Sequence, residues 1–146
     1  MRREFSAGGV VLRRLRGGLW LAAIRPQGKP EGTWALPKGL IGEGEGSEAT
    51  ARREVEEETG LEADPLAKLG DVRYVYTWRG ERVFKVVSFF LFRYRRGRIG
   101  AIAPAMRREV ADARWLPLDE ASGLLAYKGE REMAEKAAVA AVEHDL

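Results

Sequence analysis

The ten residues from Val83 to Phe92, VFKVVSFFLF, constrain the fold of this chain more than any other segment. Only Lys85 and Ser88 among them are polar. So apolar a run, rich in β-branched and aromatic residues, is typical of a buried central strand, because a half-exposed strand alternates apolar and polar residues. At 146 residues the chain is long enough to bury a core, and we expect residues 1–146 to form one domain.

The rest of the chain predicts strands and helices that alternate along the sequence. Strands are expected at 5–12, 19–24, 34–36, 66–77, 113–116 and 82–94, the last of which contains the apolar run. Turns at Gly17-Gly18 and Arg79-Gly80 join two of these pairs as hairpins. Helices are expected from an N-cap at Ser47 to Gly60, from 117 to 125, and from 129 to about 143. This order predicts an α/β sandwich with a mixed β-sheet.

Composition excludes several classes of protein. No apolar run approaches the roughly 20 residues that span a membrane, and the N-terminus lacks the sustained apolar core of a secretory signal. The chain has no cysteine, which excludes disulfides and thiolate metal sites. These features favour a cytoplasmic location without a membrane partner. The net charge of +3 is too small to indicate binding to duplex nucleic acid.

Charge is nevertheless segregated along the chain. Residues 43–62 hold eight Glu against two Arg, a local net charge of −6, so the remaining residues together carry +9. A basic body around one acidic block fits a cation site that faces a polyanion.

The expected helix divides its glutamates by spacing. Side chains three and four positions apart share a face, so Glu54, Glu57 and Glu58 lie together and Glu56 points away. Mg²⁺ prefers oxygen ligands and often bridges carboxylates to phosphates. The alternative is a solvated acidic face, which is the usual role of a charge run. The glycine-rich loop at 39–46 favours the metal site, because its backbone can approach the same ion.

The run from Gly39 to Leu61 resembles the signature of the Nudix hydrolases, G-x5-E-x7-R-E-U-x-E-E-x-G-U, where U is a bulky aliphatic residue. Every specified position matches: Gly39, Glu45, Arg53, Glu54, Val55, Glu57, Glu58, Gly60 and Leu61. The motif covers 23 residues, and nine specified positions at fixed spacing make it highly specific. The elements expected on either side also fit the α/β/α sandwich of that family.

The resemblance implies a metal-dependent hydrolase of nucleoside diphosphates linked to another group. By that resemblance Glu54, Glu57 and Glu58 are the catalytic residues, and with the Gly39 carbonyl they hold Mg²⁺ or Mn²⁺. The metal neutralises developing charge and lowers the pKa of the attacking water. A carboxylate must still accept the proton of that water, and Glu54 is the first choice.

For the other charged residues the sequence indicates less specific roles. Glu45 and Arg53 are expected to form a structural ion pair between loop and helix. Glu109 is the candidate for a further metal ligand outside the signature, with a solvated loop residue as the alternative. Glu81, in a hairpin turn, and His144, near the chain end, are expected to be exposed.

Substrate contacts are expected from basic and aromatic residues. Lys38, directly before Gly39, is the first candidate for phosphate binding. Lys85 lies alone in an apolar strand and either contacts phosphate or extends its charge to solvent. Weaker candidates for phosphate binding are Arg25, Lys128 and Arg131. The candidates for stacking on a base are Tyr76, Trp78 and Tyr127, although aromatic residues in strands usually belong to the core.

The stretches WALPKG, GEGE and LPLDEASGLLAYKGERE resemble the dinucleoside polyphosphate hydrolases, which typically split diadenosine tetraphosphate to ATP and AMP. Leu40 and Gly42-Glu43-Gly44 depart from the His and the Glu-Pro-Gly that many of those enzymes carry. The alternative is a pyrophosphatase for 8-oxo-dGTP, ADP-ribose, a diphosphoinositol polyphosphate or a 5′-triphosphate RNA end. A third alternative is a non-catalytic nucleotide-binding module, against which the intact signature argues. The sequence is compatible with a monomer or a homodimer.

Overall fold

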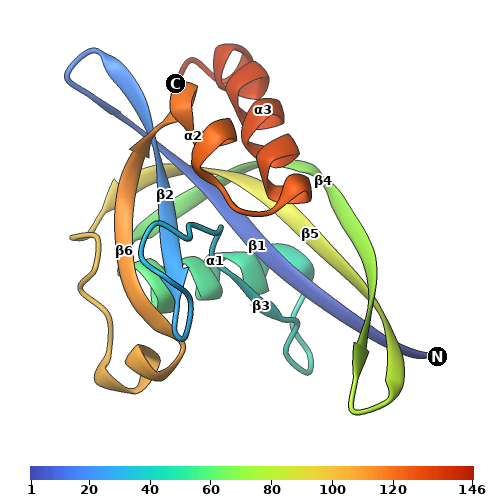
Figure 1. The fold of residues 1–146 in the computed structure, drawn as a ribbon. Coiled ribbons are helices and arrows are strands. Elements are labelled where there is room, and N and C mark those ends of the chain that lie inside the picture. Colours follow the sequence, from blue (N-terminus) through green and yellow to red (C-terminus); the bar gives the residue numbers. More distant parts are fainter.

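Six strands form a single mixed β-sheet in the computed structural model, which describes all residues from 1 to 146 (Figure 1). Five of them lie side by side in the order β4-β5-β1-β2-β6, and β3 pairs with β1. The strands are β1 (Arg2–Leu15), β2 (Gly18–Pro26), β3 (Lys38–Leu40), β4 (Glu62–Trp78), β5 (Glu81–Arg96) and β6 (Val110–Pro117). β1 and β5 run parallel and the other pairs are antiparallel, so the predicted mixed sheet is confirmed.

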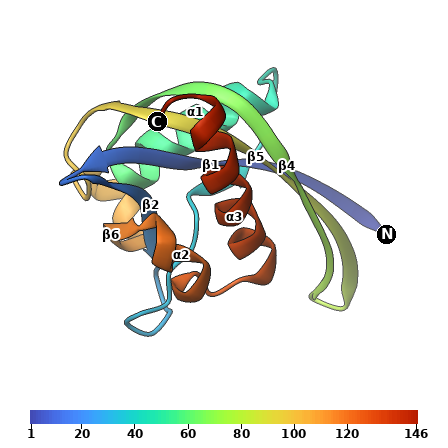
Figure 2. The same ribbon diagram turned by 90° about the horizontal axis from the view of Figure 1, so that it is seen from above.

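Helices cover both faces of this sheet (Figure 2). They are α1 (Ser47–Thr59), α2 (Leu118–Leu124) and α3 (Lys128–Glu143), and a 3-10 helix, η1 (Pro104–Arg108), precedes β6. α1 packs on one face through Ala51 and Val55. α2 and α3 pack on the opposite face, which completes the predicted α/β sandwich. None of these helices has the length and apolar character needed to cross a membrane.

β5 is the buried central strand that the sequence predicts. It lies between β4 and β1, and its side chains alternate between the two sides of the sheet. Val87, Phe89 and Leu91 belong to the core on the α3 side, whereas Phe90 and Phe92 belong to the core on the α1 side. Because both faces of the strand are covered, its sequence is apolar without alternation.

Both predicted hairpins are present. β4 and β5 turn at Arg79-Gly80 as expected, and β1 and β2 turn at Arg16-Gly17, one residue before the predicted position. All four turn residues have φ between 49° and 79°, which two-residue turns of the type I′ class require. The β4–β5 hairpin and the N-terminal end of β1 project together beyond the helices (Figure 1).

The short strand predicted at 34–36 is not formed. This segment makes only isolated bridges, and β3 begins at Lys38. The Leu36 N–H donates to the carboxylate of Glu130 instead of to a strand, and Pro37 has no N–H to donate. Regular pairing therefore resumes only after Pro37.

Glycines stand at both ends of α1. Ser47 is the first helical residue and not the N-cap, because Gly46 occupies that position with an extended backbone and no side-chain cap. Gly60 ends the helix with φ of 82°, as predicted. A Cβ at Gly60 would lie 2.5 Å from the Ala101 carbonyl oxygen. A glycine here therefore lets the loop that leads to Glu109 pack against the end of the helix.

Candidate active site

The acidic face of α1 is turned toward the sheet. Ala51 and Val55 are buried in the core beneath the helix, and this packing carries neighbouring glutamates inward. Glu54 is 7% exposed and Glu58 is 6% exposed. The Glu57 side chain is 38% exposed. Two of the three predicted metal ligands are therefore buried and the third lies at the rim.

Glu56 and Glu109 are both exposed, Glu56 as the helical spacing predicts. Glu109 follows η1. Burial is the main cause that raises the pKa values of Glu54 and Glu58, and the charge of Glu109 adds a smaller contribution to both. The loop carboxylate therefore lies on the same side of the molecule as the helix carboxylates.

Gly39 lies directly against the carboxylate of Glu54. A Cβ at Gly39 would fall 2.2 Å from the carboxylate carbon of Glu54, a separation that no real side chain tolerates. Glycine at position 39 is explained by the close approach of the Glu54 carboxylate. It is not explained by backbone conformation, because the φ of Gly39 is not in the left-handed region. The first residue of the signature thus leaves backbone beside the acidic face.

The environment of Glu58 disfavours its charged form. Burial raises its pKa and the charge of Glu54 raises it further, to about 8, although the Lys38 N–H donates to Glu58 Oε1 at 3.1 Å. The pKa of Glu54 is also raised, first by burial and then by the charge of Glu57, against the opposing charge of Arg53. The protein itself therefore supplies too little positive charge for these carboxylates.

Arg53 links the glycine-rich loop to the helix. Its Nε and Nη2 donate to the two carboxylate oxygens of Glu45 at 2.8 and 2.9 Å, and its Nη1 donates to Glu54 at 2.9 Å and Glu57 at 3.1 Å. Hydrogen bonds from Arg53 and then from Thr50 lower the pKa of Glu45 to about 2. The expected ion pair is present, and Arg53 also orients two of the candidate ligands.

The donor set fits a hard divalent cation in its chemistry. No three acidic or histidine side chains lie close enough together to form a metal-ligand cluster; Arg53 contacts Glu54 and Glu57, and the Lys38 N–H contacts Glu58. The carboxylates nevertheless supply only oxygen ligands and an excess of negative charge, which are the properties that Mg²⁺ or Mn²⁺ requires.

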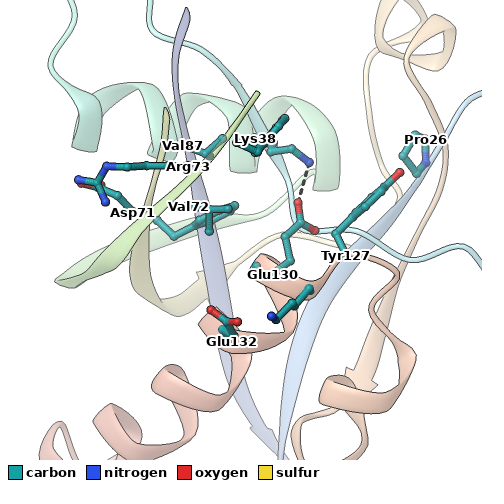
Figure 3. Close-up of a pocket in the computed structure, with 13 residues that line it drawn as sticks. Pro26, Lys38, Asp71, Val72, Arg73, Val87, Tyr127, Glu130 and Glu132 are labelled. Carbon is teal, nitrogen blue, oxygen red and sulfur yellow. Dashed lines mark hydrogen bonds and ion pairs between the residues drawn. The ribbon is translucent and has the colours of Figure 1, made fainter. Parts of the chain in front are cut away.

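A cavity of about 690 Å³ lies on the other side of Lys38, between the β4–β5 strands and the start of α3 (Figure 3). The Lys38 ammonium points to Glu130 on α3, with Nζ 2.7 Å from Oε2. The ammonium also lies 5.7 Å from the ring centroid of Tyr127. Burial lowers the pKa of Lys38, but the charge and hydrogen bond of Glu130 outweigh it and raise the pKa. Tyr74 and Lys128 also line the cavity.

The other predicted phosphate ligands are engaged elsewhere. Lys85 Nζ lies 3.9 Å from Glu4, and Lys85 does not line the cavity. Arg25 donates to the carbonyl of Lys29. Arg131 donates to the carbonyls of Leu125 and Ala126 after α2, which is a structural use of its charge.

Only one of the three aromatic candidates lines the cavity. Tyr127 does so, whereas Tyr76 and Trp78 do not. The Tyr76 hydroxyl donates to Glu4, and Trp78 is 53% exposed at the end of β4. Glu81 is exposed at the start of β5, as expected. His144 follows α3 and is partly buried, so the expectation that it is exposed is wrong.

The sequence interpretation missed two residues of this region. Tyr74 precedes Tyr76 by two positions on β4, so the same strand face carries both, and its place closer to the helices could have been inferred from the hairpin register. Glu130 stands in the charged run KGERE at the start of α3, where no local signal separates it from a surface glutamate.

Comparisons with known proteins agree on one family. The NUDIX domain model matches residues 3–138. The MutT4 protein of Mycobacterium tuberculosis is 40% identical over 138 residues, which are 92% of this chain and 54% of that protein. The asymmetrical bis(5′-nucleosyl)-tetraphosphatase of Rattus norvegicus is 33% identical over 95 residues, 65% of this chain and 63% of that enzyme. The chain thus spans about half the length of the mycobacterial relative.

A solved structure supports the same fold. The Ap4A hydrolase of C. elegans, as a binary complex, superposes with a TM-score of 0.73 at 21% identity, over 96% of this chain and 98% of that one. The family model covers nearly the whole chain, and the match includes the intact signature on α1. The resemblance seen in the sequence is confirmed, and the chain belongs to the Nudix hydrolase family.

Proposed function

We propose that this chain hydrolyses a phosphoanhydride bond of a nucleoside polyphosphate with a divalent cation, and that diadenosine tetraphosphate, split to ATP and AMP, is its substrate. The observation that carries the proposal is the pair of buried carboxylates Glu54 and Glu58, whose pKa values are both raised, chiefly by burial. Buried carboxylates with raised pKa values are a functional-site signal, because incompletely compensated charge is unfavourable for stability.

The chain's own residues supply the remaining parts of the reaction. Glu54, Glu57 and Glu58, with Glu109 and the Gly39 carbonyl, would hold Mg²⁺ or Mn²⁺. When bound, the cation neutralises phosphate charge and lowers the pKa of water. Arg53 orients Glu54 and Glu57, and the Lys38 amide orients Glu58. Glu54 accepts the proton of the attacking water.

The cavity supports a nucleoside as the group next to the phosphates. Its volume of about 690 Å³ lies within the range of small-molecule sites. Tyr127 offers an aromatic ring for a base, and the cavity lining carries charges of both signs, with Lys128 as a cation there and Lys38 paired with Glu130. We expect such a substrate in the cytoplasm, with no membrane or duplex nucleic acid as partner.

The assignment of diadenosine tetraphosphate rests on the stretches that resemble dinucleoside polyphosphate hydrolases and on the rat relative. A second candidate is 8-oxo-dGTP. Leu40, where many enzymes of the first group carry His, and Gly42-Glu43-Gly44, where they carry Glu-Pro-Gly, count against diadenosine tetraphosphate and so motivate this second candidate.

A substrate panel tests the proposal directly. Purified protein is incubated with Mg²⁺ and each nucleotide, and the products are separated by ion-exchange chromatography. We expect diadenosine tetraphosphate to give ATP and AMP in equal amounts. Absence of that cleavage, together with release of pyrophosphate from 8-oxo-dGTP, would overturn the first substrate in favour of the second. Absence of turnover on every nucleotide would instead support a binding module.

A further inference from the structure

Glu130 is the most completely engaged buried carboxylate in the molecule. It lies in the first turn of α3 and is 4% exposed. Its Oε1 accepts a hydrogen bond from the Leu36 N–H at 2.7 Å, and its Oε2 accepts one from Lys38 Nζ at 2.7 Å. Figure 3 shows the Lys38–Glu130 contact at the wall of the cavity. Carboxylates are rarely buried this deeply unless they are paired.

The partners of Glu130 belong to the segment that borders the acidic helix. The Lys38 N–H donates to Glu58. The next residue, Gly39, lies against the Glu54 carboxylate. A continuous chain of contacts therefore runs from α3, through residues 36–39, to the candidate metal ligands on α1.

A purely local role for Glu130 does not account for these contacts. A glutamate in the first turn of a helix interacts favourably with the helix dipole, and that role needs no distant partner. Both hydrogen bonds of Glu130 instead reach residues more than 90 positions away in the sequence. The carboxylate thus joins two elements on either side of the cavity.

We propose that Glu130 is a positioning residue, which holds the Leu36–Gly39 segment and the Lys38 ammonium in register with the carboxylates of α1. This inference rests on the proposed hydrolase function. Glu130 does not touch the reacting phosphate; it acts through Lys38 and through the backbone that meets Glu54 and Glu58.

A double-mutant cycle tests this role through kinetics. Glu130→Gln keeps an oxygen for the Leu36 N–H and removes the charge that pairs with Lys38. We expect kcat to fall about tenfold, the effect typical of losing a group that orients a ligand, with a smaller change in KM. The double variant Glu130→Gln/Lys38→Met should be no slower than the slower single variant, because residues that act through one contact are not additive.

A control variant separates a positioning role of Glu130 from an effect on stability alone. Glu135→Gln changes the same charge on an exposed side of the same helix and should leave kcat and KM within about twofold, as surface substitutions usually do. Each variant is assayed well below its Tm. A normal kcat in Glu130→Gln, or losses that multiply in the double variant, would overturn the proposal.

Amide hydrogen exchange tests the positioning role of Glu130 without a measurement of catalysis. In Glu130→Ala the Lys38 amide should exchange at least about tenfold faster than in the wild type or in Glu135→Gln, because the segment can open locally. Unchanged exchange would contradict positioning. If Glu130→Ala does not fold, the exchange is measured in Glu130→Gln. If the wild type cleaves no nucleotide, the proposed function fails, and the exchange rates still decide the role of Glu130.

Discussion

Buried glutamates on α1 and on α3 lie against residues 36–39, and they differ in which groups neutralise their charge. Glu130 on α3 has one amide and one ammonium for its two oxygens. Burial raises the pKa values of Glu54 and Glu58 on α1, and the charge of Glu54 raises that of Glu58 further, although Arg53 donates to Glu54 and the Lys38 N–H donates to Glu58. A buried carboxylate is costly unless its charge is compensated. The contrast indicates that the α3 carboxylate is neutralised by groups of the protein itself, whereas the α1 pair leaves a charge for a bound cation to neutralise.

The largest expected effect comes from neutralising the three carboxylates Glu54, Glu57 and Glu58, here called the α1 set. Glu57→Gln and Glu58→Gln should each lower kcat by about a hundredfold or more, because several kcal/mol of transition-state stabilisation comes from a correctly held cation. The measurement is steady-state hydrolysis of the best substrate of the panel, with circular dichroism to verify folding. Glu56→Gln, on the exposed side of α1, should leave kcat nearly unchanged. A comparable loss in that control would mean that the functional face of the helix is wrongly assigned.

The next largest effect is expected at the close contact between Gly39 and the Glu54 carboxylate. In Gly39→Ala the new Cβ must displace the Glu54 carboxylate, which ends a flexible side chain. We therefore expect kcat to fall by at least about tenfold, while the free energy of unfolding falls by only about 1 kcal/mol. Gly123→Ala is the matched control, because a Cβ there meets no atom within 4 Å. Equal losses of activity and stability in Gly39→Ala would argue that this glycine serves folding alone.

The parts that could be predicted from the sequence are those with a local pattern. The apolar run of β5, the period of α1 and the turn at Arg79-Gly80 each express their structure in neighbouring residues. The signature likewise places Glu54, Glu57 and Glu58 on one helix. Glu130 carries no such pattern, because both its hydrogen-bond partners lie more than 90 residues away.

The same limit explains the errors around the site. The strand expected at 34–36 is displaced because a distant carboxylate takes the Leu36 N–H. Lys38, the first candidate for phosphate binding, is paired with Glu130, a contact that the sequence did not predict. Neither contact is visible until α3 is packed against the sheet.

A cation titration sharpens the comparison between the two carboxylate sets. Saturating Mg²⁺ should raise the Tm of the wild type by several degrees, because a ligand at about 100 times its Kd stabilises the folded state by about 2.7 kcal/mol. Glu58→Gln should lose most of that rise, and Glu130→Gln, which acts on the ligands only indirectly, should lose a smaller part of it. Differential scanning calorimetry with and without Mg²⁺ gives both values. An equal loss in the two variants would show that the sets are not functionally distinct.

The smallest expected effect concerns a second lysine–glutamate pair, between Lys85 and Glu4. Their charged atoms are 3.9 Å apart, against 2.7 Å for Lys38 and Glu130. Neither residue lines the cavity, and Glu4 also accepts a hydrogen bond from the Tyr76 hydroxyl. Lys85→Met should therefore change kcat and KM by less than about twofold, since long ion pairs contribute little. Lys38→Met, measured beside it, should reduce kcat/KM far more. A rise in KM for Lys85→Met as large as that for Lys38→Met would place Lys85 on the path of the substrate phosphates and return it to the role that its isolation in an apolar strand first indicated.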